Sequence, residues 1–324
     1  MYPEDRVPLP PLYEPQDRPA HPFIDAMRKV YTYDESFTPE RVRRAVAAYL
    51  GLVSFTDANV GRLLRALADT GLEAGTRVIY TSDHGDNLGA RGLWGKSTLY
   101  EPSAGIPLIM RGPGIAAGTV CHTPVTLVDA YPPIVDRVGL APSASESNLP
   151  GTSWFDILRG AVPHNPALCE YHTTGAVTGA YMLRKGGFKY VHYVGMPPQL
   201  FDLDADPGEA HDLGTDPGYA GLVGQCEAES RSLLDPEFAD RTAHADQAMQ
   251  IERFGGRETI LTKGAYSFRP CRACRPSIAP SGVLAAAVPC RLARRERSQE
   301  AKTTRKPVLP AEELAASPLR AAMR

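Results

Sequence analysis

Residues 80–89 read Tyr-Thr-Ser-Asp-His-Gly-Asp-Asn-Leu-Gly, and a lysine, Lys96, follows in the same predicted loop. The segment 77–82 is short, β-branched and aromatic, which is typical of a buried strand in a parallel sheet. Because ligands collect at the carboxyl ends of strands in such sheets, we expect Asp83 and His84 at that edge. The glycine after them permits the turn that both side chains need to reach one ion. The stretch therefore predicts an α/β fold with a site at the edge of its sheet.

The side chains of Asp83, His84 and Lys96 suit hydrolysis of a charged ester. A carboxylate oxygen beside an imidazole nitrogen suits a divalent cation such as calcium or manganese. The Lys96 ammonium is placed to neutralise the oxyanion that such a metal polarises. For residues 82–85 taken alone, an ordinary turn in which Asp83 accepts hydrogen bonds from backbone amides is the alternative.

Five motifs lie between residues 79 and 114. They are Ser82-Asp83-His84-Gly85, Gly95-Lys96-Ser97, Tyr100-Glu101, Gly105-Ile106-Pro107-Leu108-Ile109 and Gly112-Pro113-Gly114. Together they closely resemble the sulfatase family of the alkaline phosphatase superfamily, above all its choline-sulfatase and arylsulfatase members and the related phosphonate monoester hydrolases. The resemblance continues over about residues 1–260. Residues 47–64 are similar to the family's long helix, and residues 198–209 are similar to its carboxyl-terminal strand and turn.

The resemblance implies a fold and a set of roles. Residues 1–160 would form the carboxyl-terminal portion of the catalytic α/β domain, with a mixed, largely parallel sheet flanked by helices. Residues 161–264 would form a smaller subdomain with an antiparallel sheet and helices. Asp83 and His84 resemble the family's second pair of metal ligands, and Lys96 resembles the lysine that binds the sulfate or phosphonate oxygens.

The family's nucleophile is a formylglycine, made from the cysteine of a Cys-x-Pro-Ser-Arg motif that lies beside an aspartate pair near the amino terminus. Nothing before Tyr80 supplies either feature, so the resemblance implies that the formylglycine belongs to an amino-terminal part outside this chain. Residues 274–278, Cys-Arg-Pro-Ser-Ile, match the motif except for the final arginine, and we expect this cysteine not to be modified. We expect Cys121, Cys169 and Cys226 to act as small buried hydrophobes.

Three further side chains are weaker candidates for contacts with a substrate. Glu170 and His172 flank a strand tyrosine and together suit a substrate cation, although ordinary packing and surface hydrogen bonding are the stronger explanation for them. His122 precedes a predicted helix and is a candidate general acid. The acidic run at 202–212 predicts a solvated turn rather than a calcium site, because it lacks the EF-hand spacing.

Local signals predict the elements around these residues. Thr38 as N-cap and Pro39 begin a helix whose apolar spacing continues to Leu67 and which ends at Gly71. Seven prolines make residues 1–36 loop-like. The other expected elements are a strand at 106–111, a helix at 126–138 broken by two prolines, short strands at 167–171, 179–183, 188–193 and 199–203, and helices at 218–234 and 239–253.

The chain has 324 residues, of which 43% are hydrophobic, and this composition is typical of a soluble protein of one or two domains. No apolar run approaches the roughly eighteen residues of a membrane span, and the proline-rich start is unlike a cleavable signal. Six cysteines do not form a disulfide framework, which fits a reducing cytoplasm. We therefore expect a cytoplasmic protein without a membrane partner.

The formal net charge of −2 is unevenly distributed. Residues 267–324 hold ten Arg, two Lys and four Glu, a net charge of +8. We predict that residues 265–324 form a disordered tail. The abrupt change of composition favours a reading-frame change over a nucleic-acid-binding segment.

These observations predict a sulfuric ester hydrolase with a divalent-metal site, present here as a partial catalytic domain. A phosphonate monoester or phosphodiester hydrolase would use nearly the same site, so this alternative stays open. A non-catalytic fragment stays open as well, because the nucleophile motif is absent. The expected partner is a small sulfate or phosphonate ester, and a homo-oligomer is possible.

Overall fold

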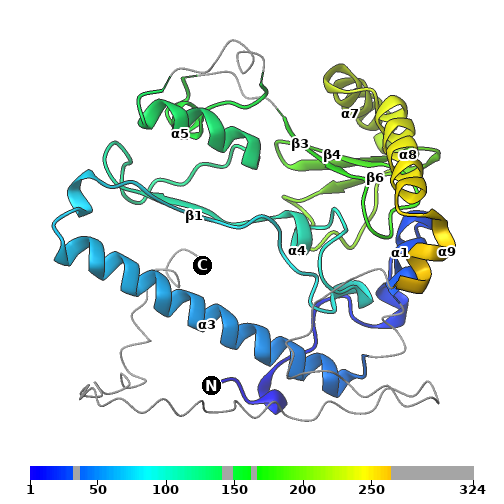
Figure 1. Ribbon diagram of the computed structural model, residues 1–324, viewed down its shortest axis with the longest axis horizontal. Coiled ribbons are helices and arrows are strands. Elements are labelled where there is room, and N and C mark those ends of the chain that lie inside the picture. Colours follow the sequence, from blue (N-terminus) through cyan, green and yellow to red (C-terminus); the bar gives the residue numbers. More distant parts are fainter. Residues whose placement is uncertain (32–36, 141–148, 162–165, 264–324) are drawn as a thin grey trace. The chain divides into compact units, whose positions relative to one another are not determined.

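The computed structural model describes residues 1–31, 37–140, 149–161 and 166–263 (Figure 1). Met1–Ala243 belong to one compact unit, and residues 244–263 belong to a second. The predicted basic tail and Cys274 lie outside the described residues. None of the helices that the structure describes combines the length and apolarity needed to cross a membrane.

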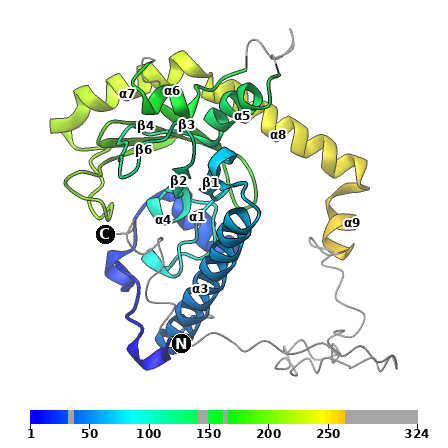
Figure 2. The ribbon, with the colours of Figure 1, turned by 90° about the vertical axis from the view of Figure 1, so that its left-hand side faces the viewer.

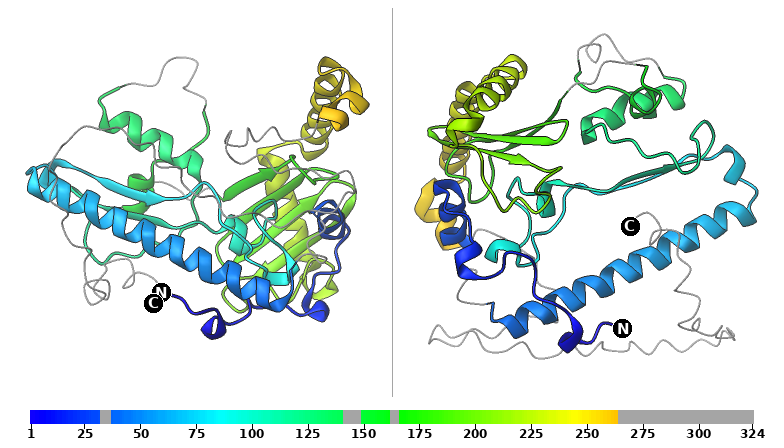
Figure 3. Two further views of the ribbon diagram at one scale, coloured as in Figure 1. Left: turned by 60° about the horizontal axis from the view of Figure 1, so that its bottom comes forward. Right: turned by 180° about the vertical axis from the view of Figure 1, so that it is seen from behind.

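The long helix α3 spans Pro39–Asp69, as its capping signals predict (Figure 3). The Thr38 side chain accepts a hydrogen bond from the backbone N–H of Arg41 at 3.4 Å, and Pro39 takes the first helical position, where its missing N–H costs nothing. Gly71, with φ of 71°, follows the helix in the left-handed conformation that favours glycine. The predicted helix is therefore confirmed at both ends.

The prediction of a loop for residues 1–36 is wrong over part of its length, because α1 spans Pro22–Tyr31. Pro22 begins this helix rather than preventing it, since its fixed φ suits the first turn. Phe23, Ile24 and Met27 are buried on one side of α1, and burial of these apolar side chains stabilises the helix.

The strand before the Asp-His pair is β1 (Val78–Thr81), and it pairs with β2 (Leu108–Arg111). The pairing is antiparallel, with Val78 opposite Arg111. The largely parallel sheet expected from the composition is not seen in the described residues, where both sheets are antiparallel. Apolar composition reports burial and not direction, and the segment between the two strands supplies a returning loop instead of a long crossover helix.

The four strands predicted in the second half form one antiparallel sheet in the order β3-β4-β5-β6. Their bounds are Ala167–Tyr171, Ala180–Lys185, Phe188–Tyr193 and Met196–Asp202. Side chains on one face, including Tyr190 and Leu200, pack with Cys226 of α7 (Ala220–Leu233). Figure 2 shows α7 lying along this sheet. The other face packs against α1 and against the loop that carries Lys96. The predicted small antiparallel sheet is thus confirmed. One of its faces packs against the loop that carries Lys96.

The remaining elements are short, apart from α8. They are α4 (Glu101–Ala104), α5 (Tyr131–Arg137), α6 (Trp154–Leu158), α8 (Pro236–Arg253), α9 (Gly256–Lys263) and the 3₁₀ turns η1 (Glu4–Arg6), η2 (Pro15–Asp17), η3 (Glu73–Gly75), η4 (Ala90–Gly92), η5 (Leu127–Ala130) and η6 (Pro217–Tyr219). The predicted break in the helix at 126–138 lies where η5 passes into α5, whose first turn holds the two prolines.

Candidate functional site

The turn after β1 is held in place by its own polar groups and by α4. Ser82 Oγ donates to the carbonyl of His84 at 2.7 Å, and the N–H of Gly85 donates to the carbonyl of Ser103 at 2.8 Å. A Cβ atom on Gly85 would lie 2.1 Å from the carbonyl oxygen of Pro102, so only glycine fits there. The chain therefore leaves the strand in a fixed turn that presents Asp83 and His84 together.

The structure brings the three predicted residues Asp83, His84 and Lys96 into contact. Lys96 Nζ lies 2.8 Å from His84 Nε2, and the same ring nitrogen lies 3.4 Å from Asp83 Oδ2. His84 Nδ1 lies 2.9 Å from the carbonyl oxygen of Gly85. A carbonyl can only accept, so Nδ1 carries the proton and Nε2 is the acceptor that faces Lys96. In that tautomer the Nε2 lone pair accepts the hydrogen bond from Lys96, and a cation at Nε2 would have to replace this bond.

The Asp83 carboxylate is a persistent negative charge at the rim of this group, with 80% of its side chain exposed. Desolvation acts to raise the pKa of Asp83. Backbone hydrogen bonds and the electrostatic effect of the neighbouring His84 and Lys96 side chains outweigh it, so the pKa is lowered from its ordinary value. The carboxylate is therefore ionised at neutral pH and is able to bind a cation.

The donor chemistry of Asp83 and His84 suits a divalent cation, but two ligands are fewer than such an ion requires. Among the residues that the structure describes, no group of three or more His, Cys, Asp and Glu side chains is arranged to hold a metal. The pair fits part of a metal site, and a complete site needs donors from elsewhere.

Hydrogen bonds of Asp86 and Asn87 close the loop that carries Lys96. This structural role was not predicted from the sequence. Asp86 Oδ1 accepts from the N–H groups of Leu88 at 2.8 Å and Gly95 at 3.1 Å. Asn87 is buried and holds the carbonyl of Gly95 through both its backbone N–H and its side-chain amide, each at 2.8 Å. These bonds close the loop just before Lys96. An aspartate whose side chain accepts a hydrogen bond from the backbone amide two residues later is a common turn signal. The role of Asp86 in the loop could therefore have been predicted from the sequence.

A buried ion cluster anchors the same loop to the four-stranded sheet. Glu209 accepts from Lys189 Nζ at 2.8 Å and from the backbone N–H of Glu101 at 2.7 Å. Lys189 of β5 is fully buried and also donates to the carbonyl of Leu99 at 2.9 Å. The Arg91 guanidinium donates to the carbonyl of Glu209 at 3.2 Å and lies 3.7 Å from its carboxylate. The cluster therefore fixes both the middle and the end of the loop that bears Lys96.

The prediction of a solvated acidic turn at 202–212 is wrong for Glu209, which is buried. Two of its partners, Arg91 and Glu101, lie 118 and 108 residues away in sequence, and Lys189 lies 20 residues away, so no local pattern distinguishes Glu209 from its exposed neighbours. Glu209 also has a φ of 52°, which is uncommon for a residue other than glycine, and its buried hydrogen bonds hold it there.

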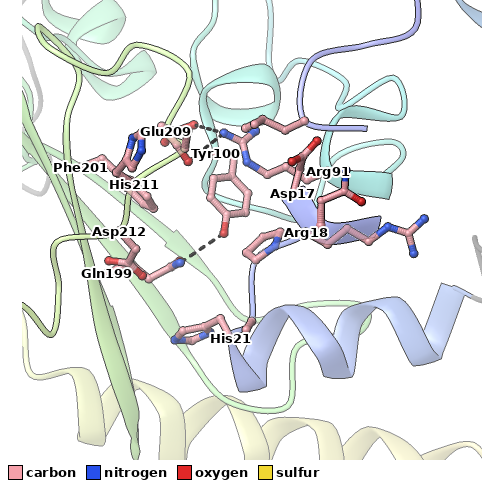
Figure 4. Close-up of a pocket in the computed structure, with 15 residues that line it drawn as sticks. Asp17, Arg18, His21, Arg91, Tyr100, Gln199, Phe201, Glu209, His211 and Asp212 are labelled. Atoms are coloured by element: carbon pink, nitrogen blue, oxygen red, sulfur yellow. Dashed lines mark hydrogen bonds and ion pairs between the residues drawn. The ribbon is translucent and has the colours of Figure 1, made fainter. Parts of the chain in front are cut away.

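Behind the loop lies a cavity of about 440 Å³ (Figure 4). Its wall includes Arg18, His21, Arg91, Tyr100 and Glu209. The Arg91 guanidinium stacks 4.3 Å from the ring centroid of Tyr100, whose hydroxyl accepts from Gln199 at 3.2 Å. Burial raises the pKa of Tyr100, so its hydroxyl stays neutral. The cavity is distinct from the predicted site, because Asp83, His84 and Lys96 are not among its lining residues.

The weaker candidates lie apart from the site loop. Glu170 and His172 contact each other at 3.3 Å at the end of β3, and His172 packs edge-on against Tyr181. His122 is exposed. Within the part of the chain that the structure describes, no hydrogen bond or ion pair joins Glu170 or His122 to the group around Lys96. Ordinary packing accounts for the contacts of His172, and the roles of all three in substrate binding stay predictions.

Known proteins are similar to this chain in sequence and in fold. Residues 19–140 match the family model described as Sulfatase, and residues 89–234 match the model described as N-sulphoglucosamine sulphohydrolase, C-terminal. The choline-sulfatase of Rhizobium meliloti (strain 1021) is 38% identical over 180 residues, which are 56% of this chain and 35% of that protein. Arylsulfatase K of Danio rerio is 34% identical over 222 residues, which are 66% of this chain and 42% of that protein.

The solved structure of a phosphonate monoester hydrolase from Silicibacter pomeroyi is similar as well. It is 29% identical and has a TM-score of 0.61, and the match covers 71% of this chain and 50% of that one. The chain thus spans about two fifths of the length of the curated relatives named above. From the two matched family models, the relatives and the shared fold, it follows that this chain belongs to the sulfatase family of the alkaline phosphatase superfamily.

Proposed function

We propose that this chain supplies the anion-binding part of a sulfuric ester hydrolase. The observation that carries the proposal is the contact of Lys96 Nζ with His84 Nε2 at 2.8 Å, next to Asp83 at the end of β1. An ammonium group held on a closed loop is preorganised to bind the oxygens of a sulfate ester, and its charge is worth most where charge develops during bond cleavage.

Each of the three side chains has a separate role in this proposal. Lys96 binds a non-bridging ester oxygen and donates a proton in a hydrogen bond to it. Asp83 and His84 hold a divalent cation together with donors from outside the described residues, and that cation would polarise the ester group. The Gly85 carbonyl keeps His84 in the tautomer whose Nε2 faces the site. The nucleophile, a formylglycine by the family resemblance, is expected in a part of the domain that this chain does not span.

A phosphonate monoester hydrolase is the second candidate function. The similarity to the solved phosphonate monoester hydrolase favours it, since that match covers 71% of this chain. Both reactions place anionic oxygens against the same lysine, so the site itself does not separate them.

Anion binding by the isolated chain tests the proposal without requiring turnover. The ring resonances of His84 are followed by NMR while sulfate and then methylphosphonate are added. We expect either anion to shift the His84 signals in the wild-type chain, and Lys96→Ala to abolish the shift. Lys185→Ala is the matched control, because it removes one exposed lysine from a different part of the molecule. An unchanged response in Lys96→Ala, or no response in the wild type, would refute the assignment.

Activity of the isolated chain tests the expected absence of the nucleophile. We expect no hydrolysis of 4-nitrophenyl sulfate or of 4-nitrophenyl phenylphosphonate, because catalytic groups that act as a unit lose nearly all activity when one is removed. Steady hydrolysis that Asp83→Ala abolishes would show instead that a nucleophile lies within this chain.

A further inference from the structure

The cavity behind the site loop has room for a small organic molecule, and the proposed function does not use it. Its volume of about 440 Å³ lies within the range of about 300–1,000 Å³ that is typical of small-molecule sites. Part of its wall is apolar and is formed by Leu12, Pro19 and Phe201. The wall also carries charges of both signs, on Asp17, Arg18, Arg91, Glu209 and Asp212. This combination favours a ligand with an apolar body and two opposite charges over a simple inorganic ion.

The guanidinium group of Arg91 is fixed at the cavity wall with part of its hydrogen-bonding capacity unused. It stacks on the ring of Tyr100, and the residue is only 3% exposed. Its contacts with the carbonyls of Gly208 and Glu209 and with the Glu209 carboxylate are all made by one nitrogen, Nη2. Nε and Nη1 have no hydrogen bond within the described residues, and neither is among the buried polar atoms that lack a partner. Both nitrogens are therefore reached by solvent, and a guanidinium group with two such donors suits a carboxylate.

The hydroxyl group of Tyr100 supplies another donor. Tyr193 Oη donates to Gln199 Oε1 at 2.8 Å, and Gln199 Nε2 donates to Tyr100 Oη at 3.2 Å (Figure 4). Tyr193 does not line the cavity, so Gln199 is the acceptor for its proton. The Tyr100 proton is then left without an acceptor in the described part of the chain. Because burial raises the pKa of Tyr100, the hydroxyl keeps this proton at neutral pH and is able to donate it to a ligand.

Asp212 places a negative charge close to these donors. Its Oδ1 accepts from the backbone N–H groups of Leu200 at 3.1 Å and Gly214 at 2.8 Å, and these two bonds fix the carboxylate. The other oxygen, Oδ2, has no hydrogen bond to any residue that the structure describes. Besides burial, the pKa of Tyr100 responds to the charges of Arg91 and Asp212, which act in opposite directions. A positive and a negative group thus lie around the same hydroxyl.

We propose that this cavity is a binding site for a zwitterionic amino acid with an apolar side chain. The carboxylate of the ligand binds the Arg91 guanidinium and the Tyr100 hydroxyl, and its ammonium group binds Asp212. The side chain of the ligand lies against Leu12 and Pro19. A ligand with only one of the two charges would leave a polar group of the wall desolvated without a partner, which costs affinity. The inference goes beyond the proposed function and does not depend on it.

Isothermal titration calorimetry of the full chain tests the proposal, with L-leucine as the probe. Two analogues each lack one charge: 4-methylpentanoate has no ammonium group, and 3-methylbutylamine has no carboxylate. We expect leucine to bind and both analogues to bind at least about fivefold more weakly, the scale of losing a hydrogen bond to a charged group. Absence of leucine binding, or equal affinity for leucine and either analogue, would overturn the proposal. Lys96 does not line the cavity, so Lys96→Ala should bind leucine with unchanged affinity, and loss of binding in this variant would overturn the proposal as well.

Three variants locate the binding site, each measured well below its unfolding midpoint. Tyr100→Phe keeps the ring that stacks on Arg91 and removes only the hydroxyl, so it should weaken leucine binding at least about threefold. Asp212→Asn keeps an oxygen that accepts from the two backbone amides but removes the charge. It should weaken the binding of leucine at least about threefold and leave the binding of 4-methylpentanoate no weaker. Asp204→Asn is the matched control, because this exposed carboxylate lies in the same acidic run outside the cavity wall, and it should change the affinity less than about twofold.

The variants also distinguish ligand contact from a structural role of the same residues. If Asp212→Asn weakened leucine and 4-methylpentanoate equally, Asp212 would only support the fold of the turn, and the assignment of the ammonium group would be overturned. Equal effects of Asp212→Asn and Asp204→Asn, or full affinity of Tyr100→Phe, would likewise overturn the proposal.

Discussion

At the scale of single residues, the candidate site depends on one glycine and on one histidine tautomer. Gly85 lets the chain pass against Pro102, and its carbonyl fixes the proton on His84 Nδ1. The orientation of the imidazole toward Lys96 is thus set by the backbone before any ligand binds. Such preorganisation removes the cost of orienting the groups when the anion arrives.

Gly85→Ala should destabilise the chain by about 1–3 kcal/mol, because the added methyl group would overlap the carbonyl oxygen of Pro102. Urea unfolding measures the loss. Gly51→Ala is the control, since a Cβ atom there meets nothing within 4 Å. Replacing glycine inside α3 should be neutral or stabilising. Equal free energies of unfolding for wild type and Gly85→Ala would mean that the turn is not held against α4.

His192, on β5, should make stability depend on pH. Burial, aided by the charge of Arg231, lowers the pKa of His192 below the ordinary value of 6.5, against the opposing carboxylates of Glu227 and Glu237. As the pH falls through about 6.5, His192 takes up a proton in the unfolded chain but stays neutral in the folded chain until a lower pH. Stability is therefore full above pH 6.5 and falls as the pH drops below it.

The free energy of unfolding of the wild type should accordingly be lower at pH 5.5 than at pH 7.5, and His192→Gln should reduce this difference. His211→Gln is the control, since this side chain is 82% exposed. Urea titrations at the two pH values provide the measurement. An identical pH dependence in wild type and His192→Gln would contradict the assignment.

At the scale of elements, helices with similar sequence signals differ in how they are stabilised. The capping residues and propensity of α3 account for its formation, although most of its apolar side chains remain partly exposed. In α1, spanning ten residues, helix propensity alone is insufficient, since isolated helices of this length are marginal in water. Burial of its apolar side against the four-stranded sheet supplies the missing stability.

Phe23→Ala should therefore destabilise the protein by about 3–5 kcal/mol, the range for removing a buried aromatic ring. Phe23 is 2% exposed and its ring lies 4.8 Å from that of Tyr193. Val30→Ala, on the same helix but 55% exposed, should change the free energy of unfolding by less than about 0.5 kcal/mol. Thermal and urea unfolding compare the two variants. Similar effects of both would show that α1 does not dock as described.

At the scale of the whole described unit, the ion cluster around Glu209 joins the site loop to the four-stranded sheet. A buried ion pair adds little net stability compared with apolar packing, but the loss of one partner leaves a buried charge without compensation. The cluster therefore holds the site loop against the four-stranded sheet through specific contacts, although the two segments are distant in sequence.

Glu209→Gln should destabilise the protein by about 3–5 kcal/mol, because it removes the buried carboxylate shared by Lys189 and Arg91 and leaves Lys189 with only the more exposed Glu101 carboxylate as its counter-charge. The double variant Glu209→Gln with Lys189→Met should recover part of this loss, since the uncompensated charge is then removed. Urea unfolding of the two single variants and the double variant gives the coupling energy. Strict additivity would mean that the two side chains do not interact.

The sequence by itself determined most of the helices and strands and the three central residues of the candidate site. The capping residues of α3, the four short strands and the group of Asp83, His84 and Lys96 were all predicted, because each depends on neighbours within a few residues or on a loop with recognisable motifs. The prolines of the first 36 residues led to the wrong prediction of a loop. Proline breaks the middle of a helix but is favoured in its first turn, where Pro22 lies.

Only the tertiary structure decided the direction of the β1–β2 pairing, the burial of Glu209 and the position of α1. These features depend on contacts across the chain, such as the bond between Lys189 and the carbonyl of Leu99, 90 residues apart. Apolar spacing records whether a residue is buried, but not which strand or charge it meets. The direction of strand pairing and the partners of buried charges depend on which distant segments pack together. The packing that forms is the one with the lowest free energy for the whole chain.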